Sequence, residues 1–181
     1  MDGPSDEDLM LRVAAGEEAA FHQLAGRYAP RAAGLARRLT GSESEAEDVV
    51  QEALLRVWIN APRWRPLAAF RTWFYRIVVN LCLNRQRRAP LVGLDEAADV
   101  RDPSPDPGEQ MEHDQAAQRL ALAIAELPER QRIALALTYS EGLGNAETAA
   151  VIGTSVSGVE TLLVRARRTL RERLGSDGVE E

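Results

Sequence analysis

A proline-rich, acidic stretch from residue 90 to about 109 divides the chain into two parts. Four of the nine prolines fall in it, at positions 90, 103, 105 and 107, and no hydrophobic periodicity continues through it. A loop of this length inside one compact domain would be unusual, so we expect two domains joined by an extended acidic linker. The 181 residues are enough for two small domains. Each would hold roughly 80 residues.

Both parts have apolar residues at helical spacing and lack an alternating strand pattern, so the predicted fold class is all-α. The first part predicts helices over 7–15, 17–39, 44–59 and 70–88. The second predicts helices over 112–127, 129–139, 146–152 and 156–174. The expected domains are therefore residues 5–89 and 112–174, with a linker over 90–111 and a short tail over 175–181.

The charge is distributed unevenly along the chain. The whole sequence has a formal charge of -6, but residues 54–94 contain eight arginines and no acidic residue. Eight like charges repel one another unless an anionic partner is present, so this block is a candidate phosphate-binding surface.

The predicted helix 70–88 lies inside this basic block and has two different faces. One face is apolar and is expected to pack in the core: Phe70, Trp73, Phe74, Ile77, Val78 and Leu81. The other is expected to lie outside the core: Thr72, Arg76, Asn80 and Arg87. Aromatic residues and arginines alternate here, as in surfaces that stack single-stranded bases and follow the phosphate backbone. The candidate nucleic-acid contacts are Arg71, Trp73, Tyr75, Arg76, Asn80, Asn84, Arg85 and Arg88, although Trp73 also fits a core position.

The last two predicted helices resemble a helix-turn-helix, with Gly153-Thr154-Ser155 as the turn. Asn145 is the expected cap of the first helix, and the second begins with either Ser155 or Ser157 as its cap. The second helix directs one set toward the core: Val156, Val159, Leu163, Ala166 and Leu170. The outward set could read base edges: Ser157, Glu160, Thr161, Val164, Arg165 and Arg168. The alternative is an ordinary helical hairpin with a solvated arginine face.

The predicted helix 44–59 carries a mixed acidic and apolar stripe. Its members are Asp48, Gln51, Glu52, Leu55 and Trp58. Such a stripe fits either a solvated helix face or a docking surface for another protein, and spacing alone leaves both open.

Several classes of protein are excluded or disfavoured. One cysteine and two histidines are too few for a Cys/His zinc tetrad, and one cysteine cannot form an internal disulfide. No apolar run approaches the length of a membrane span, and the acidic N-terminus lacks the features of a signal peptide, so we expect a cytoplasmic protein without membrane insertion. No catalytic constellation or phosphate-cradling glycine loop is present, so we expect no enzyme, no cofactor, no metal and no small-molecule substrate.

Four separated motifs resemble the extracytoplasmic-function (ECF) sigma factors of the bacterial sigma-70 family. They are, in this order, Asp48-Val49-Val50-Gln51-Glu52-Ala53, then Phe70-Arg71-Thr72-Trp73-Phe74-Tyr75-Arg76-Ile77 with Asn80, then Leu127-Pro128-Glu129-Arg130-Gln131-Arg132, and finally Ala149-Ala150-Val151-Ile152-Gly153 with Val164-Arg165-Ala166-Arg167. The resemblance extends from about Asp6 to Leu174.

The resemblance implies a function for each surface. The stripe from Asp48 to Trp58 would dock on core RNA polymerase, and the helix from Phe70 would melt and read the minus-ten promoter element. The helix-turn-helix would read the minus-thirty-five element, and an anti-sigma factor would be the expected regulator. Trp64, with Arg63 and Arg65 beside it, has no role in this scheme.

Two other functions fit parts of the sequence. A sigma-like decoy would bind an anti-sigma factor without directing transcription, but it would not need the intact arginine-rich and recognition helices. A conventional repressor or activator would use the helix-turn-helix and leave the first 110 residues unexplained.

Overall fold

The computed structural model describes residues 3–88 and 107–176, and all regular structure in these ranges is helical. The first range contains α1 (Asp6–Ala14), α2 (Glu18–Thr40), α3 (Glu43–Asn60), the short 3-10 helix η1 (Ala61–Arg63) and α4 (Phe70–Arg88). The second contains α5 (Pro107–Ala125), α6 (Glu129–Leu135), the π-helical turn η2 (Ala136–Ser140), α7 (Asn145–Ile152) and α8 (Val156–Ser176). The predicted all-α fold with two helical domains is confirmed.

Local capping explains where the first helices begin and end. Ser5 Oγ accepts a hydrogen bond from the Asp8 N–H at the start of α1, and Ser42 Oγ accepts one from Glu45 at the start of α3. Between α2 and α3, Gly41 adopts the left-handed conformation with φ 75°, which glycine reaches without steric cost. The predicted break near residue 41 is therefore correct.

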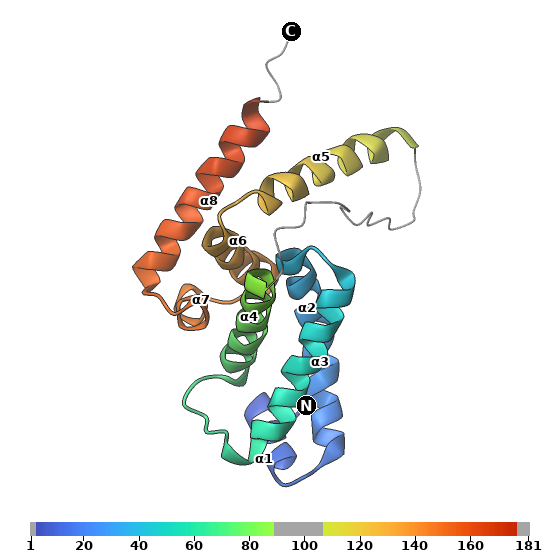
Figure 1. Cartoon of the computed structure of the whole chain (residues 1–181), viewed down its shortest axis with the longest axis vertical. Helices are drawn as coiled ribbons and strands as arrows, with labels where there is room; N and C mark the ends of the chain where they lie inside the picture. The colour runs from blue at the N-terminus through green and yellow to red at the C-terminus, as the bar shows by residue number, and fades with distance from the viewer. Residues whose placement is uncertain (1–2, 89–106, 177–181) are drawn as a thin grey trace.

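An aromatic cluster forms the centre of the N-terminal domain. Figure 1 shows α2 and α3 side by side with α4 packed against them. Phe70 and Phe74 of α4 are fully buried, with stacked rings whose centroids lie 5.8 Å apart. The Tyr28 ring of α2 meets both edge-on, at 5.1 and 5.3 Å. This geometry is the favoured one for aromatic pairs, and it orients α4 against α2.

Helix α1 closes the lower end of this domain. Its Leu9, Met10 and Val13 are buried in the core. Its Glu7 Oε1 accepts a hydrogen bond of 3.0 Å from the Phe70 N–H, the first amide of α4. A carboxylate at this position satisfies an amide that has no partner within the helix and interacts favourably with the helix dipole.

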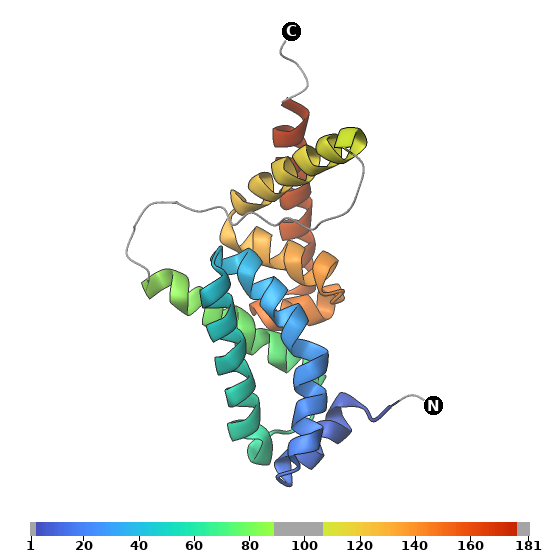
Figure 2. The ribbon, with the colours of Figure 1, turned by 90° about the vertical axis from the view of Figure 1, so that its right-hand side faces the viewer.

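The C-terminal domain has two apolar faces. Ala134, Ala149, Val159 and Leu163 form a small core of their own between α6, α7 and α8. On the opposite side, Leu137, Leu143 and Val151 belong to the same buried cluster as the N-terminal core, and α7 packs along α4. Figures 1 and 2 show this arrangement, with α7 beside α4 and α8 directed away from the N-terminal domain. The two domains therefore pack directly against each other.

Some predictions about side-chain burial are wrong. Thr72, expected outside the core, is 4% exposed, and Tyr75 and Val79 on the same side of α4 are also buried. The reason is that α4 packs against α7 as well as against α2 and α3, so more than one of its faces is covered. Val156, expected in the core, is 43% exposed because it lies in the first turn of α8, before the buried positions begin at Val159.

Some predicted boundaries also differ. Helix α5 begins at Pro107 rather than at 112, because proline is well tolerated at the first helical position, where no amide partner is needed. Helix α6 ends at Leu135 and continues as η2.

The caps of the last two helices are only partly as predicted. Gly144, not Asn145, caps α7, and its N–H donates to Glu147 Oε2 at 3.0 Å. Of the two possible caps of α8, the structure uses Ser155, whose Oγ accepts from the Gly158 N–H at 3.0 Å. Most of the predicted linker, residues 89–106, lies outside the described residues.

Candidate nucleic-acid interface

The predicted stripe on α3 forms one continuous surface. Asp48, Gln51 and Leu55 are exposed, Glu52 is half-buried, and Trp58 is 37% exposed. The Trp58 ring meets the Phe21 ring edge-on at 5.2 Å, which fixes the indole against α2 while leaving part of it in solvent. An exposed apolar patch beside carboxylates is typical of a protein-docking surface.

Arg85 connects this stripe to α4. Its guanidinium lies 3.1 Å from Asp48 Oδ2 and 3.8 Å from Glu52 Oε2. A polar cavity of about 280 Å³ lies at this junction, lined by Glu52, Arg56, Leu81, Asn84 and Arg85. The structure thus brings together residues that the sequence assigned to two different surfaces. Asn80 and Asn84 are exposed on α4, and the Arg88 side chain lies outside the described residues.

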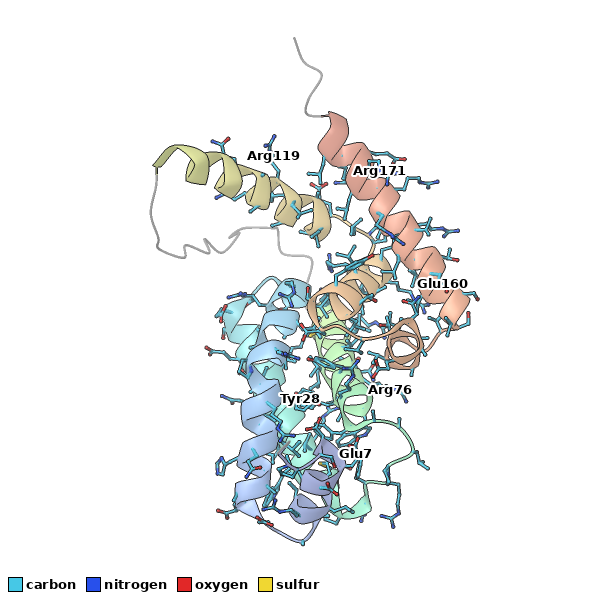
Figure 3. The ribbon with its side chains drawn as sticks, turned by 180° about the vertical axis from the view of Figure 1, so that it is seen from behind. Glu7, Tyr28, Arg76, Arg119, Glu160 and Arg171 are labelled. Carbon is cyan, nitrogen blue, oxygen red and sulfur yellow. The ribbon has the colours of Figure 1, made fainter. Side chains whose placement is uncertain are left out.

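Two arginines in the first two turns of α4 contact the C-terminal domain. Arg71 donates from Nε to Glu147 Oε1 at 2.6 Å and from Nη2 to Glu147 Oε2, and the same Nη2 donates to the Gly142 carbonyl at 3.2 Å. Arg76 donates to the Ala150 carbonyl at 2.6 Å. Figure 3 shows Arg76 extending from α4 beside α7. Arg71 is thus half-buried against protein oxygens, whereas Arg76 is exposed apart from this one hydrogen bond.

Tyr75 is the most buried of the candidate contacts, at 2% exposure. Its hydroxyl donates to Glu141 Oε2 at 2.6 Å, and Arg38 Nη2 of α2 donates to the other oxygen, Glu141 Oε1, at 2.9 Å. Glu141 itself is 6% exposed. Both of its carboxylate oxygens accept a hydrogen bond from the N-terminal domain. Burial raises the pKa of Tyr75 far above its usual range, and the hydrogen bond to Glu141 adds to this effect.

The aromatic residues of α4 act mainly as core. Trp73 is half-buried, with its ring 5.9 Å from Phe70 and 6.5 Å from Trp64. Trp64, which had no sequence-based role, is 8% exposed and anchors the connection between η1 and α4. Arg65 beside it donates to the Trp64 carbonyl at 3.1 Å. Trp73 therefore packs against the core, the position that its helical spacing also allowed.

The helix-turn-helix has the geometry that its sequence predicts. Gly153 ends α7 with φ 72°, and α7 and α8 meet at a bend of 96°, within the range typical of this motif. Val159, Leu163 and Ala166 are buried. All members of the outward set, Ser157, Glu160, Thr161, Val164, Arg165 and Arg168, are exposed. Figure 3 shows Glu160 and Arg171 on the outer side of α8.

Sequence reasoning missed Glu141, Glu147 and Arg38. Glu141 lies in a turn with Gly142 and Leu143, a context that is typical of a solvated loop. Only the packing of α7 on α4 makes it a buried partner of the other domain. No local sequence signal identifies such a contact.

Neither a metal centre nor a membrane span is found in the part of the chain that the structure describes. Residues 3–88 and 107–176 contain no group of three or more histidine, cysteine, aspartate or glutamate side chains placed to bind a metal ion. Within the same ranges, no single helix is long and apolar enough to span a membrane; the pair α7 and α8 reaches that length and composition only when both are joined across their bend.

Two family models match the chain, one in each domain. The model of sigma-70 region 2 matches residues 24–90, and the model of sigma-70 region 4 matches residues 109–170. The first match covers α2 to α4 and the second covers the helices from α5 into α8.

Complete proteins of similar length also match. The ECF RNA polymerase sigma factor SigM of Mycobacterium tuberculosis is 36% identical over 174 residues, which cover 94% of this chain and 85% of SigM. The solved structure of CnrH, from Cupriavidus metallidurans, in complex with the cytosolic domain of CnrY has a TM-score of 0.74 and 28% identity, covering 96% of this chain and 99% of CnrH. The sigma factor RpoE of Bartonella quintana, solved with the anti-sigma factor NepR, shares the fold at a TM-score of 0.71 and 22% identity, covering 87% and 98% of the two chains.

The ion pair between Arg71 and Glu147 predicts a measurable titration. The hydrogen bond from Arg71 lowers the pKa of Glu147. The pair therefore stabilises the contact between the domains at pH values above the ordinary glutamate pKa. This stabilisation is lost as the pH falls through the lowered pKa of Glu147. We expect Arg71→Ala to raise the titration midpoint of the Glu147 side-chain carboxyl, measured by carbon-13 NMR. Arg76→Ala, whose parent side chain contacts a backbone carbonyl, is the control and should leave the midpoint unchanged. The same midpoint in the native chain and Arg71→Ala would contradict this prediction.

Proposed function

Because the chain belongs to the ECF sigma factors of the sigma-70 family, we propose that it directs core RNA polymerase to a specific set of stress- or signal-responsive promoters. The main support is that the two matched regions correspond to the two structural domains and occur in the family order. The recognition helix of the second domain is also exposed. The site of action would be the cytoplasm, where the polymerase works, and the chain itself would catalyse no reaction.

The α3 stripe is proposed to dock on core polymerase. Leu55, at 55% exposure, and Trp58 offer apolar contact area, while Asp48, Gln51 and Glu52 offer polar contacts beside it. Interface contacts of this kind combine an aromatic anchor with a polar rim. The rigidity of Trp58 against Phe21 supports an anchor role, because little side-chain entropy would be lost on binding.

The α4 surface is proposed to contact the melted minus-ten element. Arg71, Arg76 and Arg85 carry the positive charge that follows a phosphate backbone, and Asn80 and Asn84 are exposed on the same helix and can bond base edges. Tyr75, whose hydroxyl donates to Glu141 of the C-terminal domain, would reach the DNA strand only after the domains separate. Trp73, packed against Phe70 and Trp64, would hold the helix in shape. Arg88 continues the basic series at the end of α4.

Helix α8 is proposed to read the minus-thirty-five element in the major groove. Arg165 could donate to guanine, Glu160 could accept from cytosine, and Thr161 could do either. The apolar Val164, 59% exposed, suits the methyl group of thymine. Ser157 at the start of the helix and Arg168 one turn beyond Val164 suit phosphate contacts.

An anti-sigma factor is proposed as the regulator. The support is that RpoE, which shares this fold, was solved with the anti-sigma factor NepR, and that CnrH was solved with the cytosolic domain of CnrY. A partner protein bound to a chain of this architecture is therefore sterically feasible.

Run-off transcription with purified core RNA polymerase tests the proposed function. The template is fragmented DNA from the source genome, with and without the protein, and the 5′ ends of the transcripts are mapped. We expect new start sites that share two upstream elements at a constant spacing. Binding to core polymerase or to an anti-sigma factor without new start sites would instead support a sigma-like decoy.

A double substitution tests the docking surface. Gln51→Ala with Glu52→Ala removes two polar contacts at the centre of the stripe, so we expect weaker binding to core polymerase, measured by fluorescence anisotropy, with the fold unchanged by circular dichroism. The matched control is Gln23→Ala with Glu18→Ala on α2, which changes the same residue types outside the stripe. Equal affinities for both double variants would remove the stripe from the docking surface.

A single substitution tests base reading by α8. Arg165→Ala should weaken discrimination between the mapped upstream element and a scrambled one by roughly 1 to 3 kcal/mol, if the guanidinium contacts a base edge. Arg171→Ala is the comparison, because a phosphate contact should lose affinity equally on both sequences. Competition binding with the assembled holoenzyme gives both numbers. A uniform loss for Arg165→Ala would make it a phosphate contact.

A further inference from the structure

Helix α4 begins without a capping side chain from its own neighbourhood. The residue that precedes Phe70 is Ala69, whose methyl group cannot accept a hydrogen bond. Three other helices begin with serine caps: Ser5 at α1, Ser42 at α3 and Ser155 at α8. At α4 the acceptor comes from 63 residues away, because Glu7 Oε1 accepts a hydrogen bond of 3.0 Å from the Phe70 N–H. Another helix thus supplies what the sequence next to α4 lacks.

Glu7 is itself held in place by the first turn of α1. Ser5 Oγ caps that turn through the Asp8 N–H. Asp6 Oδ1 accepts a hydrogen bond of 2.6 Å from Arg27 of α2, and Asp6 Oδ2 accepts one from the Tyr28 hydroxyl. Three consecutive residues therefore attach α1 to its own backbone, to α2 and to α4. The Glu7 carboxylate is a fixed point on the N-terminal domain rather than the end of a free side chain.

The loop 65–69, which leads from Trp64 into α4, depends on its two ends for its position. Trp64 is 8% exposed and Phe70 is 1% exposed, whereas every residue of the loop is exposed. Leu67, in the middle of the loop, is 94% exposed. Helix α1 packs against η1 before the loop and against α4 after it. Figure 3 shows Glu7 beside the start of α4, where the loop ends.

The loop and the start of α4 are basic. Arg63 and Arg65 are exposed on either side of Trp64, and Arg71 lies in the first turn of α4. A carboxylate beside a phosphate-binding surface weakens DNA binding by its charge alone. If Glu7 acted only through its charge, its removal would strengthen DNA binding. If Glu7 positions α4, its removal would instead reduce the discrimination between promoter sequences.

We propose that Glu7 is a positioning residue of the minus-ten surface, whose hydrogen bond to the Phe70 amide fixes the end of loop 65–69 and the first turn of α4 relative to α1. This role rests on the proposed function, since the minus-ten element is the ligand of the surface that is positioned. Glu7 acts through the backbone of α4 and itself contacts no DNA. The contact between α1 and α4 is independent of the function assigned to α4.

Four full-length variants test this role. Glu7→Ala removes the acceptor, and Glu7→Gln keeps an amide oxygen within reach of the Phe70 N–H. Asp8→Ala is the matched control, because Asp8 is an exposed acid in the same turn of α1 whose carboxylate accepts a hydrogen bond from Ser5. Glu7→Ala with Ala69→Asp has the native net charge and gives α4 a cap of its own.

Amide hydrogen exchange reports the contact without polymerase or DNA. We expect exchange of the Phe70 amide to become at least about fivefold faster in Glu7→Ala, the factor that corresponds to the loss of a typical helix cap. Glu7→Gln and Asp8→Ala should stay close to the native rate. Unchanged exchange in Glu7→Ala would show that this hydrogen bond does not hold the start of α4, and it would overturn the proposal.

Open-complex formation by the holoenzyme reports the functional consequence. The templates are a promoter mapped by run-off transcription and the same promoter with a scrambled minus-ten element. We expect Glu7→Ala to reduce the ratio between the two templates by at least about threefold, because apparent affinity scales with the population of the competent arrangement. Glu7→Gln and Asp8→Ala should keep the native ratio. An unchanged or increased ratio in Glu7→Ala, or an equal loss in either of the other two variants, would overturn the proposal.

The double variant separates capping from positioning. Glu7→Ala with Ala69→Asp should recover the thermal stability of the native chain but not its minus-ten discrimination, because a local cap does not connect α4 to α1. Ala69→Asp alone, which keeps Glu7, corrects the ratio for the effect of the added carboxylate. Recovery of both stability and discrimination in the double variant would make Glu7 a cap only and overturn the proposal.

Failure of the proposed function gives a different result from failure of this inference. If run-off transcription shows no new start sites while Glu7→Ala speeds exchange at Phe70, the proposed function fails and the contact between α1 and α4 stands. New start sites with an unchanged minus-ten ratio in Glu7→Ala would support the proposed function and overturn the role of Glu7.

Discussion

The packing of helix α4 determines most of what surrounds it. Phe70 and Phe74 build the aromatic core with Tyr28, while Arg71, Tyr75 and Arg76 form the contact with the C-terminal domain. A helix that is covered on one side by a core and on another by a second domain has few positions left whose side chains face solvent. This double burial explains why Thr72 and Tyr75 are buried although they lie opposite the aromatic core positions of α4.

The electrostatics follow from the same arrangement. The arginine-rich segment has no acid of its own, so like charges would repel one another in the free protein. The structure brings acids to it from distant parts of the chain: Glu147 reaches Arg71, and Asp48 and Glu52 reach Arg85. These partners lie at the two ends of α4 and belong to different helices. Each pair is exposed enough to be exchanged for another anion at modest cost.

Most of the architecture could be predicted from the sequence because the relevant signals are local. Helical spacing, Gly41, Gly153 and the serine caps locate the helices and the helix-turn-helix within a few residues. The prediction of the outward face of α8 was correct for the same reason, because the packing of one helix on one small core determines that face. The contact between Tyr75 and Glu141 could not be predicted, because it joins positions 66 residues apart across two domains. Trp64 was missed because its packing depends on Trp73 and not on its own neighbours in sequence.

Helix α1 changes where the first structural unit begins. The region 2 match starts at residue 24, inside α2, whereas Leu9, Met10 and Val13 of α1 are part of the core, and Glu7 satisfies the first amide of α4. A fragment cut at the family boundary would expose apolar core surface and leave the amide of Phe70 without its carboxylate. The unit that folds is therefore larger than the unit that sequence comparison delimits, and its N-terminal edge is α1, which completes the core and caps the start of α4.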